Sequence, residues 1–241
     1  DTALTIHQLV DAIKETKNGS RFNNRMEIEK EIASAKKKWL EEWMPILESD
    51  EEPIAYYRVI QELNNTLDLE NSIVTHDAGA PRDCLVPFYK ATQPHSYIGW
   101  GKTTHLGFGI PLMIGAKLAQ PNKFCVNVMG DGAFGMSGTD IETAARSQVP
   151  ITTILLNNSA MATYTGNNRE AIGEEARTKY GISNMYVDYA KIAEGMGAKG
   201  IKVTSTKDIA PALQKAQKLN EEGITVLIEV ETNIEERRSK F

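Results

Sequence analysis

A Gly-Asp-Gly turn, followed at a set distance by two asparagines, is the feature that most constrains the fold. An apolar segment at 124–129 runs into the turn at 130–132, and a second apolar segment at 151–156 ends in the asparagine pair at 157–158. The residues between turn and pair number 24 (133–156), which is the length of a βαβ unit. Because open parallel sheets bind ligands at the carboxyl ends of their strands, we expect both clusters at one ligand-binding edge.

These clusters combine one carboxylate, from Asp131, with the amide oxygens of Asn157 and Asn158. Such hard oxygen ligands suit Mg²⁺ that carries a polyphosphate. Gly-Asp-Gly before a helix is also an ordinary turn and helix cap. The asparagine pair at the end of the next strand favours the metal site over that interpretation.

The rest of the chain alternates between strand and helix patterns. We predict strands at 72–75, 124–129, 151–156, 200–203 and 224–230. We predict helices at 5–17, 24–48, 56–67, 106–118, 138–148, 189–196 and 205–219. This order predicts an α/β fold, a three-layer sandwich in which helices cover both faces of a mainly parallel sheet. An acidic stretch and Pro53 place a boundary between a helical segment, 1–52, and an α/β domain, 53–241.

Bulk properties exclude several classes of function. The 241 residues carry a net charge of −5, and the lysine run 36–38 is flanked by glutamates, so we expect no nucleic-acid partner. No apolar run approaches the roughly 20 residues that cross a bilayer. Two cysteines and no signal peptide indicate a reduced, cytoplasmic protein.

From about Pro53 onward the chain resembles a known family, the thiamine diphosphate (ThDP) enzymes, and specifically the C-terminal, diphosphate-binding domain of their acetolactate synthase-like branch. The resemblance rests on the spacing of the turn and the asparagine pair, and on the segment HLGFGIPLMIGAKLAQP at 105–121. The branch includes acetolactate synthase, 2-hydroxyacyl-CoA lyase, oxalyl-CoA decarboxylase and benzoylformate decarboxylase. It implies the ThDP-binding fold for 53–241 and the tail of a middle domain, with its linker, for 1–52.

The resemblance also implies the cofactors, ThDP and Mg²⁺. The Asp131 carboxylate, the Asn158 side-chain oxygen and the backbone carbonyl of Ala160 would bind the cation. The residues expected to contact ThDP through the turn and the following loop are Gly130, Asp131, Gly132, Ala133, Asn158, Ala160, Met161 and Ala162. Backbone N–H groups at the start of the helix after the turn would face the diphosphate.

Four further contacts to ThDP follow from the same resemblance. Leu106, 25 residues before Asp131, matches the aliphatic side chain that supports the bent coenzyme. Thr104 would offer its carbonyl to the 4′-amino group. Gly79 and Ala80 match a phosphate-side loop, although family members carry a polar pair after the glycine where this chain has Ala80-Pro81.

The implied activity is the cleavage or formation of a carbon–carbon bond next to a carbonyl, with a 2-oxo acid or acyl-CoA as substrate. The residues after Asn158 differ from those of acetolactate synthase, which favours a sibling lyase or decarboxylase. No catalytic residue is assigned, because the activating glutamate of the family belongs to an N-terminal domain that has no counterpart here. We therefore expect a fragment or separate subunit that is inactive alone, with the missing domain and a homodimer or homotetramer as partners.

Alternative functions stay open at this point. The segment 130–135 matches G-x-G-x-x-G, as in an NAD-dependent oxidoreductase, but asparagines replace the acidic residue expected after the next strand. A non-catalytic remnant of a ThDP enzyme is a further alternative. The segment 96–103 misses the P-loop pattern by one residue and lacks the preceding strand. His76, His95 and His105 are candidates for proton transfer or zinc binding, without zinc-site spacing, and Lys102 for a substrate anion.

Overall fold

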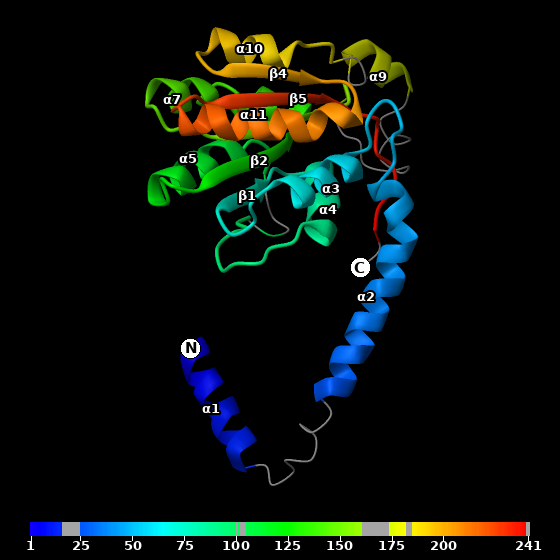
Figure 1. Cartoon of the computed structure of the whole chain (residues 1–241), viewed down its shortest axis with the longest axis vertical. Helices are drawn as coiled ribbons and strands as arrows, with labels where there is room; N and C mark the ends of the chain where they lie inside the picture. The colour runs from blue at the N-terminus through cyan, green and yellow to red at the C-terminus, as the bar shows by residue number, and fades with distance from the viewer. Residues whose placement is uncertain (16–24, 100, 102–104, 161–173, 182–184, 240–241) are drawn as a thin grey trace. The chain divides into compact units, whose positions relative to one another are not determined.

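The chain divides into two compact units, which are described separately. The structure is a computed structural model (Figure 1), and it describes residues 1–15, 25–99, 101, 105–160, 174–181 and 185–239. The units are Asp1–Pro45 and Ile46–Phe241. The boundary that the sequence predicts, between residues 52 and 53, falls inside the second unit and stays a prediction.

The first unit is helical. It contains α1 (Thr2–Glu15) and most of α2 (Arg25–Leu47). No residue of α1 is buried. The apolar residues that led to the prediction of this helix, among them Ile6, Leu9 and Ile13, are more than half exposed.

The second unit is built on a parallel sheet with the strand order β1-β2-β3-β5-β4. The strands are β1 (Ser72–His76), β2 (Phe124–Gly130), β3 (Thr152–Asn157), β4 (Lys199–Val203) and β5 (Val226–Glu231). Every pair of neighbouring strands runs parallel. Nearly all residues of β1, β2, β3 and β5 are buried, as expected for strands covered on both faces.

Helices cover both faces of this sheet (Figure 1). They are α3 (Tyr56–Thr66), α4 (Ala80–Phe88), α5 (Gly109–Ala119), α6 (Asp131–Ser137), α7 (Asp140–Arg146), α10 (Tyr189–Gly195) and α11 (Ile209–Glu221), with the short α9 (Glu174–Tyr180) and the 3₁₀ turn η3 (Thr206–Asp208). α3 packs against α4 and α11. Residues of α5, α6, α7 and α10 share one apolar core with the sheet. The predicted fold class is confirmed.

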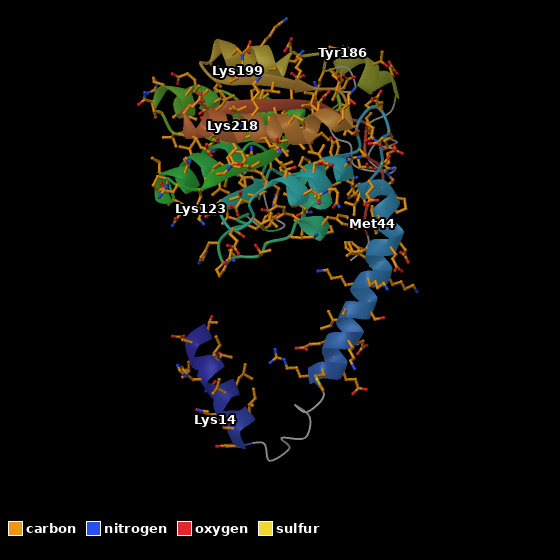
Figure 2. The ribbon with its side chains drawn as sticks, in the orientation of Figure 1. Lys14, Met44, Lys123, Tyr186, Lys199 and Lys218 are labelled. Atoms are coloured by element: carbon orange, nitrogen blue, oxygen red, sulfur yellow. The ribbon has the colours of Figure 1, made fainter. Side chains whose placement is uncertain are left out.

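Charged side chains lie on the outside of the second unit. Lys199 of β4 and Lys218 of α11, labelled in Figure 2, are both exposed. The core between the layers is apolar, with Ile110, Met129 and Leu155 fully buried. Burial of this kind is the main stabilising contribution to such a domain.

The helix predicted at 138–148 corresponds to α7 (Asp140–Arg146), and a separate helix, α6 (Asp131–Ser137), precedes it. α6 begins at once after β2, and α7 starts at Asp140. At the break, the Phe134 ring approaches Gly138 so closely that a Cβ there would lie 2.5 Å from the ring. The pattern of apolar residues alone did not reveal this contact, since it depends on the backbone path between α6 and α7.

Candidate functional site

Two strand ends lie side by side at the carboxyl edge of the sheet. β2 ends at Gly130 and β3 ends at Asn157, and the parallel pairing sets Gly130 opposite Leu156. Asp131 opens α6 directly after β2, and Asn158 follows β3. The structure thus brings together the two clusters that the sequence places at one edge.

Asp131 is a buried carboxylate with one oxygen unsatisfied. Its side chain is 3% exposed. Oδ1 accepts the N–H of Gly132 at 2.7 Å, whereas the buried Oδ2 has no hydrogen-bond partner among the described residues. Burial raises the pKa of Asp131 to about 6, against the effect of the backbone N–H groups of Gly132 and of residues 158–160. A buried carboxylate in this state is costly unless a cation or donor reaches it.

Asn158 holds its side chain between two partners. Oδ1 accepts the N–H of Ala160 at 2.9 Å, and Nδ2 donates to the Tyr56 hydroxyl at 2.6 Å. Ser159, between the two, has a φ of 54°, in the left-handed region that side chains seldom adopt. This turn keeps Ala160 close to the asparagine.

Asn157 has a different, structural environment. Its Oδ1 accepts the N–H of Ser159 at 3.0 Å, and its Nδ2 donates to Glu229 Oε1 at 2.8 Å. The other oxygen of Glu229 accepts the N–H of Ala190 at 2.9 Å. Asn157 therefore ties the end of β3 to β5 and α10, and its side chain is occupied by these contacts.

The turn residues expected to contact a diphosphate open α6. Gly132 is half-buried and Ala133 is 2% exposed. The first N–H groups of a helix have no partner within the helix. Small side chains at these positions leave the backbone accessible to an anion.

The predicted phosphate-side loop lies beside the same turn. Gly79, with a φ of 88°, precedes α4, and Ala80 is its first residue. A Cβ on Gly130 would lie 3.8 Å from Pro81 Cγ. No helix was predicted here, because the two prolines of α4 obscured the helical pattern. Pro81 is tolerated because the first turn of a helix needs no N–H donor.

Asp77 is a residue that the sequence reasoning missed. It is fully buried, and its carboxylate accepts the N–H groups of Ala78 at 2.7 Å, Gly107 at 2.9 Å and Gly109 at 2.9 Å. The pKa of Asp77 is raised, because the effect of burial exceeds the opposite effect of these N–H groups. The carboxylate joins the end of β1 to the start of α5. An aspartate directly after an apolar strand, together with a Gly-x-Gly segment before a helix, was the available signal.

Leu106 lies in the turn just before α5, half-buried and packed against the apolar core. The helix predicted from residue 106 begins at Gly109 instead. Gly107 has a φ of 95°, which a helix does not accommodate. Thr104, Met161 and Ala162, the other expected ThDP contacts, and Lys102 lie outside the described residues.

Of the three candidate histidines, His76 is buried in the fold. It is 2% exposed, its Nδ1 lies 3.1 Å from the Asp77 carbonyl, and its ring packs edge-on against Phe108. Burial lowers the pKa of His76, so the ring is neutral at pH 7. His95 and His105 are exposed.

A cavity of about 700 Å³ opens beside His76. Its lining includes Arg82, Tyr97, Gly99 and Arg238. Arg82 is paired with Asp83 at 2.7 Å, and Arg238 donates to backbone carbonyls of the C-terminal segment. This cavity therefore lies at the end of β1 and has cationic groups on its wall.

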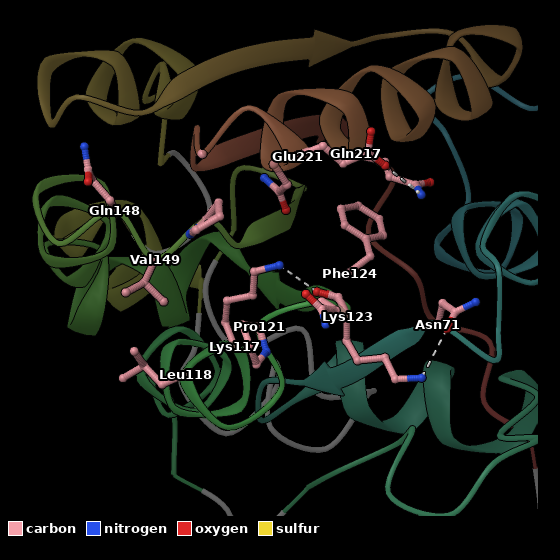
Figure 3. A pocket seen from close by; sticks show the side chains of 14 residues that line it. Asn71, Lys117, Leu118, Pro121, Lys123, Phe124, Gln148, Val149, Gln217 and Glu221 are labelled. Atoms are coloured by element: carbon pink, nitrogen blue, oxygen red, sulfur yellow. Dashed lines mark hydrogen bonds between the residues drawn. The ribbon is translucent and has the colours of Figure 1, made fainter.

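A second cavity, of about 590 Å³, lies at the opposite edge of the sheet (Figure 3). Its lining includes Asn71 and Phe124, where β1 and β2 begin, and Lys117 of α5. Lys117 Nζ donates to the Lys123 carbonyl at 2.8 Å, and Lys123 Nζ donates to Asn71 Oδ1 at 3.3 Å. It is thus remote from the two clusters at the carboxyl edge.

Among the residues described, no three His, Cys, Asp or Glu side chains form a potential metal-binding group. Within the same part of the chain, none of the helices has the length and apolar character needed to cross a membrane. A cation at the carboxyl edge would instead meet one carboxylate and neutral oxygens. That donor set fits Mg²⁺ better than zinc.

Residues 77–230 match the family model described as "Thiamine pyrophosphate enzyme, C-terminal TPP binding domain". The chain belongs to the thiamine pyrophosphate enzymes. This confirms the resemblance to the acetolactate synthase-like ThDP enzymes. The match begins at Asp77 and includes the glycine turn and the asparagine pair.

Individual thiamine pyrophosphate enzymes support the assignment. The chain is 28% identical over 184 residues to a "Probable acetolactate synthase large subunit" of Methanocaldococcus jannaschii, covering 74% of this chain and 31% of that one. It is 30% identical over 179 residues to the sulfoacetaldehyde acetyltransferase of Alcaligenes xylosoxydans xylosoxydans, covering 72% and 28%. A solved structure, the thiamine diphosphate-dependent 4-hydroxybenzoylformate decarboxylase of Rhodococcus jostii RHA1, superposes with a TM-score of 0.65 at 25% identity, covering 78% and 34%. The chain thus spans about a third of each relative.

Proposed function

We propose that this chain forms the diphosphate- and Mg²⁺-binding part of a ThDP-dependent enzyme that cleaves or forms a carbon–carbon bond next to a carbonyl. The observation that carries the proposal is the buried Asp131 carboxylate, whose Oδ2 has no partner within the described residues. Its position beside the end of β3, in a chain that belongs to this family, supports a cation at that oxygen.

The surrounding donors fit Mg²⁺ with a diphosphate. Asp131, the Asn158 side-chain oxygen and the Ala160 carbonyl are the proposed protein ligands, all of them hard oxygens. Ala133, in the first turn of α6, would direct its backbone N–H at the diphosphate, as would Gly132 once its N–H leaves Asp131 Oδ1. The cation would screen the Asp131 carboxylate from the phosphate charge.

When bound, ThDP supplies an electron sink for breaking or making the carbon–carbon bond. The residues of this chain bind and orient it. Leu106 is assigned to support the bent coenzyme, next to the loop that Asp77 holds through the N–H groups of Gly107 and Gly109. The apolar core behind Leu106 excludes water from that side.

We assign the substrate space to the cavity beside His76. Its volume of about 700 Å³ suits a small molecule. Arg238 and Arg82, the latter paired with Asp83 on the same wall, would bind an anionic group, as a 2-oxo acid or an acyl-CoA carries. The relatives are a synthase, an acetyltransferase and a decarboxylase. These relatives support ThDP as the coenzyme of this chain. Because their reactions differ, the reaction of this chain has to be measured.

Turnover is proposed to require more than this chain. The aligned residues of this chain cover 31% and 28% of two of its relatives, and we propose that the activating glutamate belongs to a part of them outside that alignment. That part would come from the same longer chain or from another subunit, in a homodimer or homotetramer. Cys84 and Cys125 are free and buried, which is in keeping with the cytoplasmic location that we propose.

Calorimetric titration of ThDP into the protein, in Mg²⁺ and in EDTA, tests the cation site. We expect binding in Mg²⁺, accompanied by a rise in melting temperature. Asp131→Asn should weaken the Mg²⁺-dependent binding by about tenfold or more. Asp140→Asn, which removes the same charge at the start of α7, is the matched control and should bind as wild type does. Equal binding by wild type and Asp131→Asn would refute the proposed cation site.

A further inference from the structure

Tyr56 links helix α3 to the candidate cation site. It is the first residue of α3 and 2% exposed. Its hydroxyl oxygen accepts a hydrogen bond of 2.6 Å from Asn158 Nδ2, across 102 positions of the sequence. Residue 56 lies outside the 77–230 segment that matches the family model.

The two partners of Asn158 determine which way its amide faces. The N–H of Ala160 can only donate, so the atom 2.9 Å from it is the oxygen, Oδ1. Nδ2 then faces Tyr56, whose oxygen accepts from it. A half-turn of the amide would bring Nδ2 against the Ala160 N–H, two donors facing one another. The Ala160 N–H therefore determines the orientation of the Asn158 amide, and the Tyr56 hydroxyl holds its Nδ2.

This arrangement leaves the amide oxygen able to bind a second group. A carbonyl oxygen has two lone pairs, and the Ala160 N–H uses one of them. Asp131 also acts on this group: burial and, next to it, the charge of Asp131 raise the pKa of the Tyr56 phenol. The carboxylate, the phenol and the amide are thus one cluster.

We propose that Tyr56 is a positioning residue of the cation site, which holds Asn158 with its oxygen turned toward the cation that Asp131 binds. The inference rests on the proposed function. A residue that orients a metal ligand through a hydrogen bond typically changes metal affinity by about 10–100-fold. Tyr56 would act in this way from α3, a helix that comes before all strands of the sheet in the sequence.

Tyr57 provides a matched control on the same helix. It is fully buried, and its hydroxyl donates to the backbone carbonyl of Arg237 at 2.9 Å. Tyr57→Phe removes one buried phenolic hydrogen bond, as Tyr56→Phe does, without touching Asn158. A general loss of stability therefore affects both variants, whereas a loss of cation affinity affects one.

The experiment measures the ratio of ThDP affinity in Mg²⁺ to that in EDTA by calorimetry, together with the melting temperature of each variant. We expect Tyr56→Phe to lower this ratio by about tenfold and Tyr57→Phe to leave it within about twofold. In an Asn158→Ala background, Tyr56→Phe should change the ratio by less than about twofold, because its partner is absent.

The outcomes separate this inference from the function on which it rests. Wild type without Mg²⁺-dependent ThDP binding overturns both. Mg²⁺-dependent binding that Asp131→Asn removes, with the same ratio for Tyr56→Phe and Tyr57→Phe, overturns the role of Tyr56 alone. An undiminished effect of Tyr56→Phe in the Asn158→Ala background also overturns it, because the effect then does not pass through Asn158.

Discussion

Asp131→Asn should stabilise the protein in the absence of ligands, although the same change removes a proposed metal ligand. In the folded protein the pKa of Asp131 is raised from 3.8 to about 6. The difference is about 2.2, and one pKa unit corresponds to about 1.36 kcal/mol, so the ionised side chain costs the folded state about 3 kcal/mol at pH 7.5. Because the side chain is 3% exposed, solvent screening reduces this figure little.

Asparagine recovers part of that cost. It retains an oxygen for the Gly132 N–H, but its NH₂ group takes the place of the buried Oδ2, which has no hydrogen-bond partner among the described residues, and this unsatisfied donor offsets about 1 kcal/mol. We therefore expect a net gain of about 2 kcal/mol, a rise in melting temperature of about 4–8 °C for a domain of this size. Thermal and urea unfolding in EDTA, for wild type, Asp131→Asn and Asp140→Asn, measure it.

The stability difference between Asp131→Asn and wild type should depend on pH in a defined direction. A carboxyl group whose pKa is raised in the folded state binds its proton more tightly there than in the unfolded chain. The stabilising contribution is complete below about pH 4 and is lost as the pH rises through about 6. The advantage of Asp131→Asn should therefore appear between pH 4 and 7 and level off above that. An advantage that is absent at pH 7.5, or that does not change across this range, would refute the reasoning.

Two further predictions concern the elements around the site. Asp77→Asn should destabilise the protein by about 2–4 kcal/mol, because an amide cannot accept the three backbone N–H groups that the carboxylate binds; urea unfolding measures this, and a loss below about 0.5 kcal/mol would contradict it. Gly138→Ala should cost about 1–3 kcal/mol, because its Cβ would lie 2.5 Å from the Phe134 ring. Gly135→Ala, whose Cβ meets nothing within 4 Å, is the control in the same thermal unfolding series and should be neutral or slightly stabilising.

The sequence predicted the parts of the fold that depend on local patterns. β2, β3 and the turn between β2 and α6 follow from apolar runs that end in special residues, and the parallel sheet follows from their alternation with helices. The meeting of Asp131 and Asn158 at one edge follows from the same rule, since parallel strands end together.

Contacts between distant segments were not predictable in this way. Asp77 binds N–H groups about 30 positions away. Tyr56 binds Asn158 from another helix. The apolar pattern of that helix predicts that Tyr56 is buried, but it does not predict the partner of its hydroxyl group. The start of α5 was placed too early, because the apolar pattern continues through Gly107, where a positive φ interrupts the helix. Such features depend on the path of the backbone, which composition and periodicity do not encode.

The position of α3 affects how this protein can be shortened. A fragment cut to the family match would start at Asp77 and lose both α3 and β1, and β2 would become an open edge inviting association between molecules. Ile54, just before α3, forms a bridge with Thr232 beyond the last strand. An expression fragment that keeps β1 and this bridge intact should therefore begin before Ile54 and extend past Thr232.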